Sequence, residues 1–134
     1  MSHLITCQDL NERIDAASDL VVIDCRFDLS EPALGLTQYL EGHIPSAHYL
    51  HLNDDLSGPI IINQTGRHPL PNPDLLARKL GKIGIQSGAR VVAYDHNHGA
   101  FAARLCWLLR WLGHDNVQVL DGGYAQWQAQ ALPI

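Results

Sequence analysis

The chain has 134 residues, of which 46% are apolar, and a formal net charge of −5 at pH 7. This length suits one domain spanning residues 1–134, which can bury a core without disulfides or metals. The acidic balance and the scattered Lys and Arg residues argue against a nucleic-acid or anionic-membrane partner, because either would need clustered positive charge.

The cysteines are widely spaced, at Cys7, Cys25 and Cys106. Such spacing predicts neither a zinc site nor a disulfide framework, and it favours reduced thiols. The first residues are polar and lack the apolar segment of a signal peptide. No stretch is long and apolar enough to cross a bilayer. We therefore expect a cytoplasmic protein that does not insert into a membrane.

Helix and strand signals alternate along the first half of the chain. Thr6, followed three residues later by Asp9, marks a helix start. Leu20–Ile23 is a continuous apolar run, typical of a strand that is covered on both faces. Residues 27–42 give a mixed pattern with proline and glycine breaks. A second short strand is predicted at Ala47–Leu52.

A long polar connection, Asn53–Pro71, separates the two halves. Loops of this length in compact domains are often functional or contact a neighbour. The loop ends at Asn72-Pro73-Asp74, which supplies a helix cap, a proline at the first position and an acid in the first turn. The sequence therefore predicts a helix after this loop, ending near Gly81 and Gly84.

The second half continues the alternation. Strands are predicted at Arg90–Tyr94 and Val117–Leu120, and helices at Ala100–Leu112 and Tyr124–Gln130. Strands that alternate with helices favour an α/β domain with a mainly parallel sheet.

Ligands of such sheets bind beyond the carboxyl ends of the strands. The loops that qualify are Asp24–Phe27, Asp95–Gly99 and Asp121–Gly123. The best candidate is Asp95-His96-Asn97-His98-Gly99, because it leads into the N-terminus of the longest predicted helix. Backbone N–H groups at such a position favour an anion and could lower the pKa of a cysteine. The alternative is a polar loop that only caps the helix.

Other chemistries have weaker support. Asp95, His96 and His98 could be read as a metal cluster, but they offer only two imidazole ligands. The chain has no GxSxG elbow and no glycine-rich nucleotide loop, so we expect neither cofactor nor metal. Cys25 lies beside Arg26, which could stabilise a thiolate. A small buried strand residue is the simpler interpretation of Cys25.

Several segments, in the right order along the chain, carry a more specific signal. Tyr39–Ala47 resembles an aromatic residue followed by Gly-His-Ile-Pro-Gly-Ala, with Ser46 in place of the second glycine. Asp24-Cys25-Arg26 resembles an Asp-x-Arg that ends an early strand. Val119–Trp127 resembles a closing Gly-Gly-aromatic-x-x-Trp segment, and Gly66–Pro71 resembles the long loop of two-domain sulfurtransferases. Together these segments resemble the rhodanese family.

The resemblance implies a three-layer fold with a five-stranded, mainly parallel sheet and helices on both faces. Active members of the family carry a cysteine directly after the strand that matches Arg90–Tyr94. That cysteine accepts sulfane sulfur as a persulfide and passes it to a thiophilic acceptor. Asp95 stands at this position, and a carboxylate cannot form a persulfide. We therefore expect no catalytic residue in the degenerate loop, and an inactive chain when it is alone.

The same substitution resembles the first, non-catalytic domain of a tandem thiosulfate or 3-mercaptopyruvate sulfurtransferase. The expected partner is then a second rhodanese domain of the same protein, which supplies the cysteine and acts on a small sulfur-containing substrate. The alternative is a free-standing rhodanese-like module that binds or regulates without catalysis.

Positions in the chain also suggest roles for single residues, and the resemblance suggests those of Arg67 and His68. Arg26 is expected to pair with Glu41, and His43 to hold its turn by a hydrogen bond. Arg67 and His68 are expected to face the partner domain, with an ordinary solvated loop as the alternative. The family-motif positions with structural roles are Asp24, Arg26, Glu41, His43, Pro45, Gly122, Gly123 and Trp127.

Overall fold

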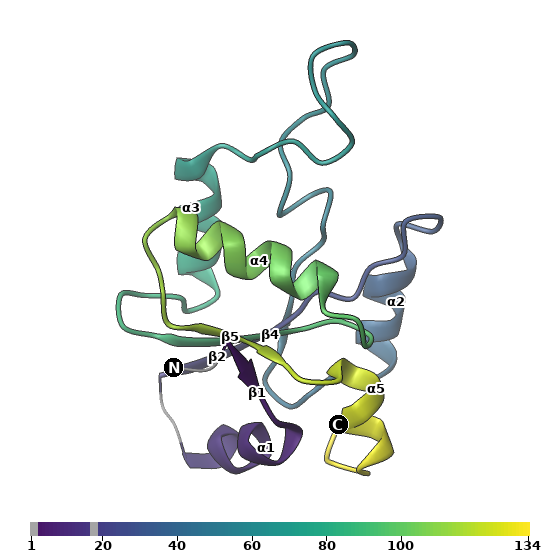
Figure 1. The fold of residues 1–134 in the computed structure, drawn as a ribbon, viewed down its shortest axis with the longest axis vertical. Coiled ribbons are helices and arrows are strands. Elements are labelled where there is room, and N and C mark those ends of the chain that lie inside the picture. The colour runs from purple at the N-terminus through teal and green to yellow at the C-terminus, as the bar shows by residue number, and fades with distance from the viewer. Residues whose placement is uncertain (1–2, 17–18) are drawn as a thin grey trace.

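The computed structural model describes residues 3–16 and 19–134, and Figure 1 shows how its elements are arranged. In chain order they are β1 (Leu4–Ile5), α1 (Cys7–Ala16), β2 (Leu20–Asp24), α2 (Leu34–Glu41), β3 (His48–Tyr49), α3 (Pro73–Lys82), β4 (Arg90–Tyr94), α4 (Ala100–Trp111), β5 (Val117–Leu120) and α5 (Gly123–Ala129).

The strands form one sheet in the order β1-β5-β4-β2-β3, and all described strand pairs are parallel. In the central pair, Leu20 lies opposite Arg90 and Asp24 lies opposite Tyr94. The predicted five-stranded, mainly parallel sheet is confirmed. Because parallel strands end at the same edge, the loops after β2, β4 and β5 come together there.

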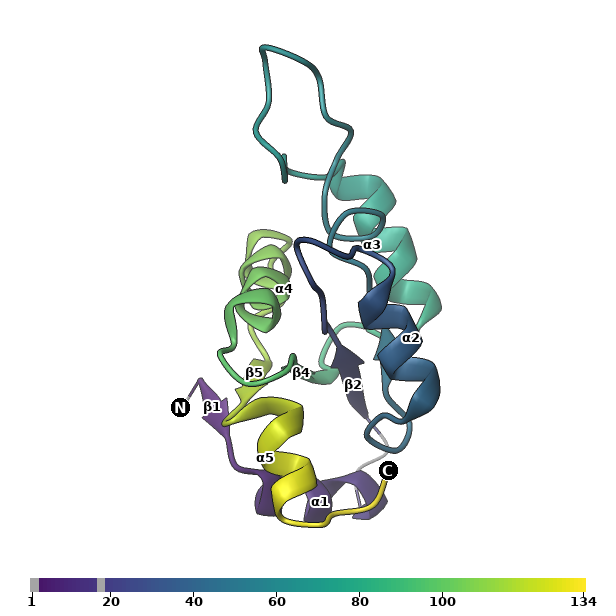
Figure 2. The same ribbon diagram turned by 90° about the vertical axis from the view of Figure 1, so that its right-hand side faces the viewer.

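Helices cover both faces of the sheet (Figures 1 and 2). On one face, α3 and α4 bury Leu80 and Leu105 against strand residues such as Val91. On the other face, α1 and α5 bury Leu10 and Trp127 in a second core cluster. The central strands are thus covered on both sides, which explains their continuous apolar sequences. The predicted α/β architecture is confirmed.

The element boundaries mostly match those expected from the sequence, but α2 and β1 were not predicted. A β-carbon added to Gly35, in the first turn of α2, would lie 2.1 Å from the carbonyl oxygen of Arg26. The close approach therefore requires a glycine, which weakens the local helix signal. β1 has only two residues, too few to show a pattern. Within residues 3–16 and 19–134, no helix is both long and apolar enough to span a membrane.

The start of α3 provides a direct test of the fold. The side-chain oxygen of Asn72 accepts hydrogen bonds from the N–H groups of Asp74 (3.0 Å) and Leu75 (3.1 Å). Asn72→Ala should lower the free energy of unfolding by about 1 kcal/mol, because both donors lose this acceptor. Urea denaturation would measure the loss. Asn72→Asp should stay close to the original protein, so an equal loss in both variants would contradict this capping role.

Candidate functional site

The carboxylate of Asp95 fills the N-terminus of α4. Its Oδ1 accepts the N–H of Gly99 at 3.0 Å, and its Oδ2 accepts those of Phe101 (3.0 Å) and Ala102 (3.1 Å). The residue is only 1% exposed. These N–H groups have no partner within the helix, and the helix dipole favours a negative charge beside them. The loop therefore caps the helix, which was the alternative expected from the sequence, and the chain's own carboxylate takes the place of an external anion at these N–H groups.

A second helix fastens the same loop from the other side. At the start of α5, the N–H of Tyr124 donates to the carbonyl of Asp95, and the N–H of Ala125 donates to that of His96, both at 2.8 Å. Gly123 has a φ of 62°, and a β-carbon there would lie 2.7 Å from both carbonyl oxygens. Gly122 also lies in the left-handed region, with a φ of 80°. The two glycines let α5 approach the loop this closely.

The polar side chains of the loop do not assemble a reactive group. Nδ1 of His98 accepts the N–H of Ala100 at 3.1 Å, and its ring packs edge-on against Phe101. Burial, followed by the nearby charge of Arg26, lowers the pKa of His96, while Asn97 is exposed. No three His, Cys, Asp or Glu side chains of the described residues could jointly hold a metal ion.

A buried ion pair lies at the adjacent strand end. Asp24 is fully buried and Arg26 is 3% exposed. Nη2 of Arg26 lies 2.6 Å from Oδ2 of Asp24, and its Nε also contacts that carboxylate. The expected pairing of Arg26 with Glu41 is wrong. Glu41 lines the same cavity of about 260 Å³, but Asp24 lies two residues from Arg26 at the same strand end and captures the guanidinium.

This ion pair joins several elements. The hydroxyl of Tyr94 donates to Oδ2 of Asp24 at 2.9 Å and accepts the N–H of Ile44 at 3.2 Å. Arg26 also donates to the carbonyl of Gly42 at 2.7 Å, and its guanidinium lies 4.0 Å from the centre of the Tyr124 ring. Burial, followed by the charge of Asp24, raises the pKa of Tyr94, which keeps its hydroxyl protonated. No role was predicted for Tyr94, although its position before Asp95 could have suggested one.

The turn after α2 is held by His43 and its neighbours. Nδ1 of His43 lies 2.8 Å from the carbonyl of Tyr39, and the two rings stack 3.9 Å apart. Around Pro45, the N–H of Ala47 donates to the carbonyl of Ile44 at 3.0 Å. Ser46 has a φ of 68°, which explains why a glycine suits this position better.

The segment that contains Trp127 is closed by a hydrogen bond. Trp127 is fully buried, and its Nε1 donates to the carbonyl of Pro133 at 2.8 Å. The bond ties the segment after α5 back onto that helix. Trp127 therefore anchors the core on this face and lies away from the Asp95 loop.

The long loop is anchored to α4 by Arg104, another residue for which no role was predicted. Nη2 of Arg104 donates to the carbonyls of Leu56 (3.0 Å), His68 (3.2 Å) and Pro69 (3.2 Å). Arg67 is exposed and His68 is half-buried, and both line a cavity of about 170 Å³ together with Phe27. Burial, followed by the charges of Arg104 and Arg67, lowers the pKa of His68.

This loop region contains unsatisfied polar atoms. Nδ1 of His68 and Nε of Arg104 are buried and have no hydrogen-bond partner among the described residues. Buried polar atoms without a partner are uncommon in complete structures. Phe27, which lines the cavity, also packs edge-on against Phe101 at the start of α4, with ring centroids 5.6 Å apart.

The cysteines are poor nucleophiles in this environment. Cys7, Cys25 and Cys106 are each 2% exposed. Burial, followed by the charge of Asp24, raises the pKa of Cys25 well above its usual range. Burial raises the pKa of Cys106 to about 11 and also raises that of Cys7. The idea of Cys25 as an activated thiol therefore has no support in its surroundings.

Comparison with known proteins shows which protein family the chain matches. A family model described as "Rhodanese-like domain" matches residues 6–130. The chain is 49% identical over 134 residues to a Pseudomonas aeruginosa protein named "Probable 3-mercaptopyruvate sulfurtransferase", covering 99% of this chain and 47% of that protein. It is 33% identical to the Arabidopsis thaliana "Thiosulfate/3-mercaptopyruvate sulfurtransferase 2", covering 87% of this chain and 33% of the relative.

Solved structures of sulfurtransferases also match the fold of this chain. The 3-mercaptopyruvate sulfurtransferase from Leishmania major matches with a TM-score of 0.83 and 29% identity, over 96% of this chain and 34% of that structure. SseA from Escherichia coli matches with a TM-score of 0.80 and 28% identity, over 98% and 49%. The chain thus spans less than half the length of each of these relatives.

Removing the Asp95 carboxylate tests its role in the loop. Asp95→Ala should lower the free energy of unfolding by roughly 3 kcal/mol, because three N–H groups lose their acceptor in a buried place. Asp95→Asn keeps one acceptor oxygen and should lose less. Guanidinium denaturation would measure both. His98→Ala is the matched control, since its ring accepts only one exposed N–H; an effect as large as that of Asp95→Ala would contradict this assignment.

Proposed function

The chain belongs to the rhodanese-like domain family, and on this premise we propose that it is the non-catalytic domain of a sulfurtransferase. In this proposal a second rhodanese-like domain of the same protein carries the cysteine. That cysteine moves sulfane sulfur from thiosulfate or 3-mercaptopyruvate, the compounds in the names of its relatives, to a thiophilic acceptor. Its location in the cytoplasm stays a prediction.

The buried carboxylate of Asp95 is the observation that carries the proposal. It takes the hydrogen bonds of Gly99, Phe101 and Ala102, which would otherwise be free for an incoming anion. A carboxylate has no sulfur to form a persulfide, and its charge would repel thiosulfate or a mercaptoacid at this site. The loop supports the fold in a place where an active domain would carry out chemistry.

No other described group could replace the missing thiol. A sulfur-accepting cysteine must ionise and be reached by its donor. Cys7, Cys25 and Cys106 are buried, and their pKa values are raised. Each is therefore a neutral thiol near pH 7, and sulfur transfer by this chain alone is not expected.

The loop with Arg67 and His68 is the part that we expect to face the second domain. Together with Phe27, these residues line a cavity at the edge where the strands end. The unpartnered Nδ1 of His68 is consistent with a site that is completed by another part of the protein. The relatives are more than twice as long as the matched region, which leaves room for such a domain.

Sulfur transfer measured on two proteins tests the proposal. One is the 134-residue chain, and the other is the two-domain protein, in which a second rhodanese-like domain follows it. Incubated with thiosulfate and cyanide, or with 3-mercaptopyruvate and a dithiol that reduces the persulfide to sulfide, the chain alone should produce no thiocyanate or sulfide above the uncatalysed rate. Mass spectrometry should find no adduct of about 32 Da, the mass of one sulfur atom, on its cysteines. The two-domain protein should form these products at a rate well above the uncatalysed one.

A Cys→Ser change in the loop of the second domain is the control, and it should abolish turnover. Retained activity in that variant would contradict the proposal. So would turnover by the chain alone, or a persulfide on Cys25.

A further inference from the structure

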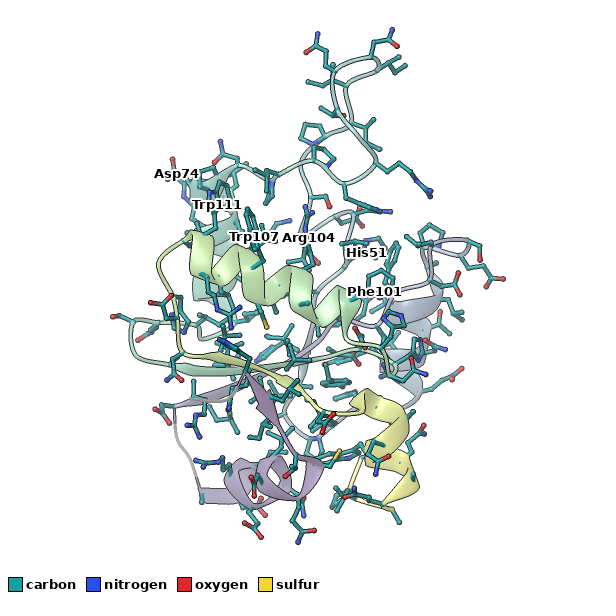
Figure 3. All side chains as sticks on the ribbon, viewed as in Figure 1. His51, Asp74, Phe101, Arg104, Trp107 and Trp111 are labelled. Atoms are coloured by element: carbon teal, nitrogen blue, oxygen red, sulfur yellow. The ribbon has the colours of Figure 1, made fainter. Side chains whose placement is uncertain are left out.

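The outer side of α4 carries large apolar side chains without a partner. Trp107 is 52% exposed and Trp111 is 40% exposed. Their rings stack with centroids 6.0 Å apart and an angle of 18° between planes. Figure 3 shows both on the side of α4 that is turned away from the sheet. The opposite side of α4, with Leu105 and Leu109, is already buried in the core.

The exposure of Trp107 and Trp111 to water is energetically unfavourable for the isolated chain. Burying apolar surface gains roughly 25 cal/mol per Å², and tryptophan offers one of the largest such surfaces. The third tryptophan, Trp127, is fully buried. Aromatic side chains, and tryptophan above all, are concentrated at the centres of protein interfaces. The stacked pair is therefore the kind of anchor that a partner protein would cover.

The long loop extends the same surface. Arg104, one turn before Trp107, holds the base of this loop through three carbonyl groups. At the tip, Ile60, Ile61 and Ile62 are 62%, 48% and 83% exposed. The tip forms a turn, in which the N–H groups of residues 64 and 65 both donate to the carbonyl of Ile61 at 3.0 Å. Figures 1 and 2 show the loop projecting from the side of the sheet that α3 and α4 cover.

We propose that the outer face of α4, with Trp107 and Trp111, and the loop tip Ile60–Ile62 form the docking surface for a second rhodanese-like domain of the same protein. This inference rests on the proposed function. The surface continues from the loop that carries Arg67 and His68, so one partner can cover both. The match covers 47% of the Pseudomonas aeruginosa relative and 49% of SseA, so more than half of each relative lies outside it. That remaining length is enough for a second domain of similar size. A domain that is permanently attached suits an apolar patch that would otherwise promote aggregation.

Hydroxyl-radical footprinting read by mass spectrometry tests the docking surface residue by residue. The chain alone is compared with the two-domain protein. Oxidation of Trp107 and Trp111 should fall at least about fivefold when the second domain is attached, because interface cores exclude water. Two residues serve as internal controls: Trp127 should be unreactive in both proteins, and Leu40, which is 73% exposed on α2, should react equally in both.

A double variant supplies a second readout. W107S together with W111S should loosen the two-domain protein, which would raise its radius of gyration in solution scattering, whereas Leu40→Ser should leave that radius unchanged. Equal oxidation of the tryptophans in both proteins would overturn the proposal. Protection that rises with the concentration of the chain alone would also overturn it, in favour of a second copy as the occupant. Neither measurement depends on activity, so sulfur transfer by the chain alone would refute the proposed function and leave this test intact.

Discussion

The hydrogen bonds between the Asp95 carboxylate and the start of α4 are the constraint on which the rest of the site depends. Three N–H groups converge on this buried side chain, and α5 binds the carbonyl oxygens of the same loop. An active site needs such a convergence to be empty and able to receive a reacting group. Here the Asp95 carboxylate fills it, so within this chain the loop holds the start of α4 in place.

The ion pair of Asp24 and Arg26 makes this filled loop part of a larger rigid unit. Tyr94, which directly precedes Asp95, donates to Asp24, while Arg26 reaches the carbonyl of Gly42 and the ring of Tyr124. Buried charges are tolerated when hydrogen bonds satisfy them from several sides. The ends of β2 and β4, the turn after α2 and the start of α5 are therefore held together by one polar network.

The two sides of the strand edge consequently have different characters. At the Asp95 loop, the carboxylate of Asp95 and the carbonyls of Asp95 and His96 all accept hydrogen bonds from within the chain. On the side of Arg104, the stacked ring surfaces of Trp107 and Trp111 face solvent. The Asp95 carboxylate is therefore satisfied within the domain, whereas the exposed tryptophan pair has the composition of an interface core. This asymmetry is the structural basis for assigning support to one side and contact with a second domain to the other.

Local signals were sufficient for much of this protein. Continuous apolar runs defined β2 and β4, and the Asn72 cap defined the start of α3. The prediction that this domain lacks a nucleophile rests on the family resemblance at Asp95. Tertiary structure alone decided the rest. Arg26 pairs with Asp24 instead of Glu41, position 35 must be a glycine because the carbonyl of Arg26 approaches α2 closely there, and Trp107 and Trp111 lie outside the core. Periodicity cannot distinguish an apolar helix face that packs on the sheet from one that awaits a partner, because burial depends on what the folded chain places opposite each face.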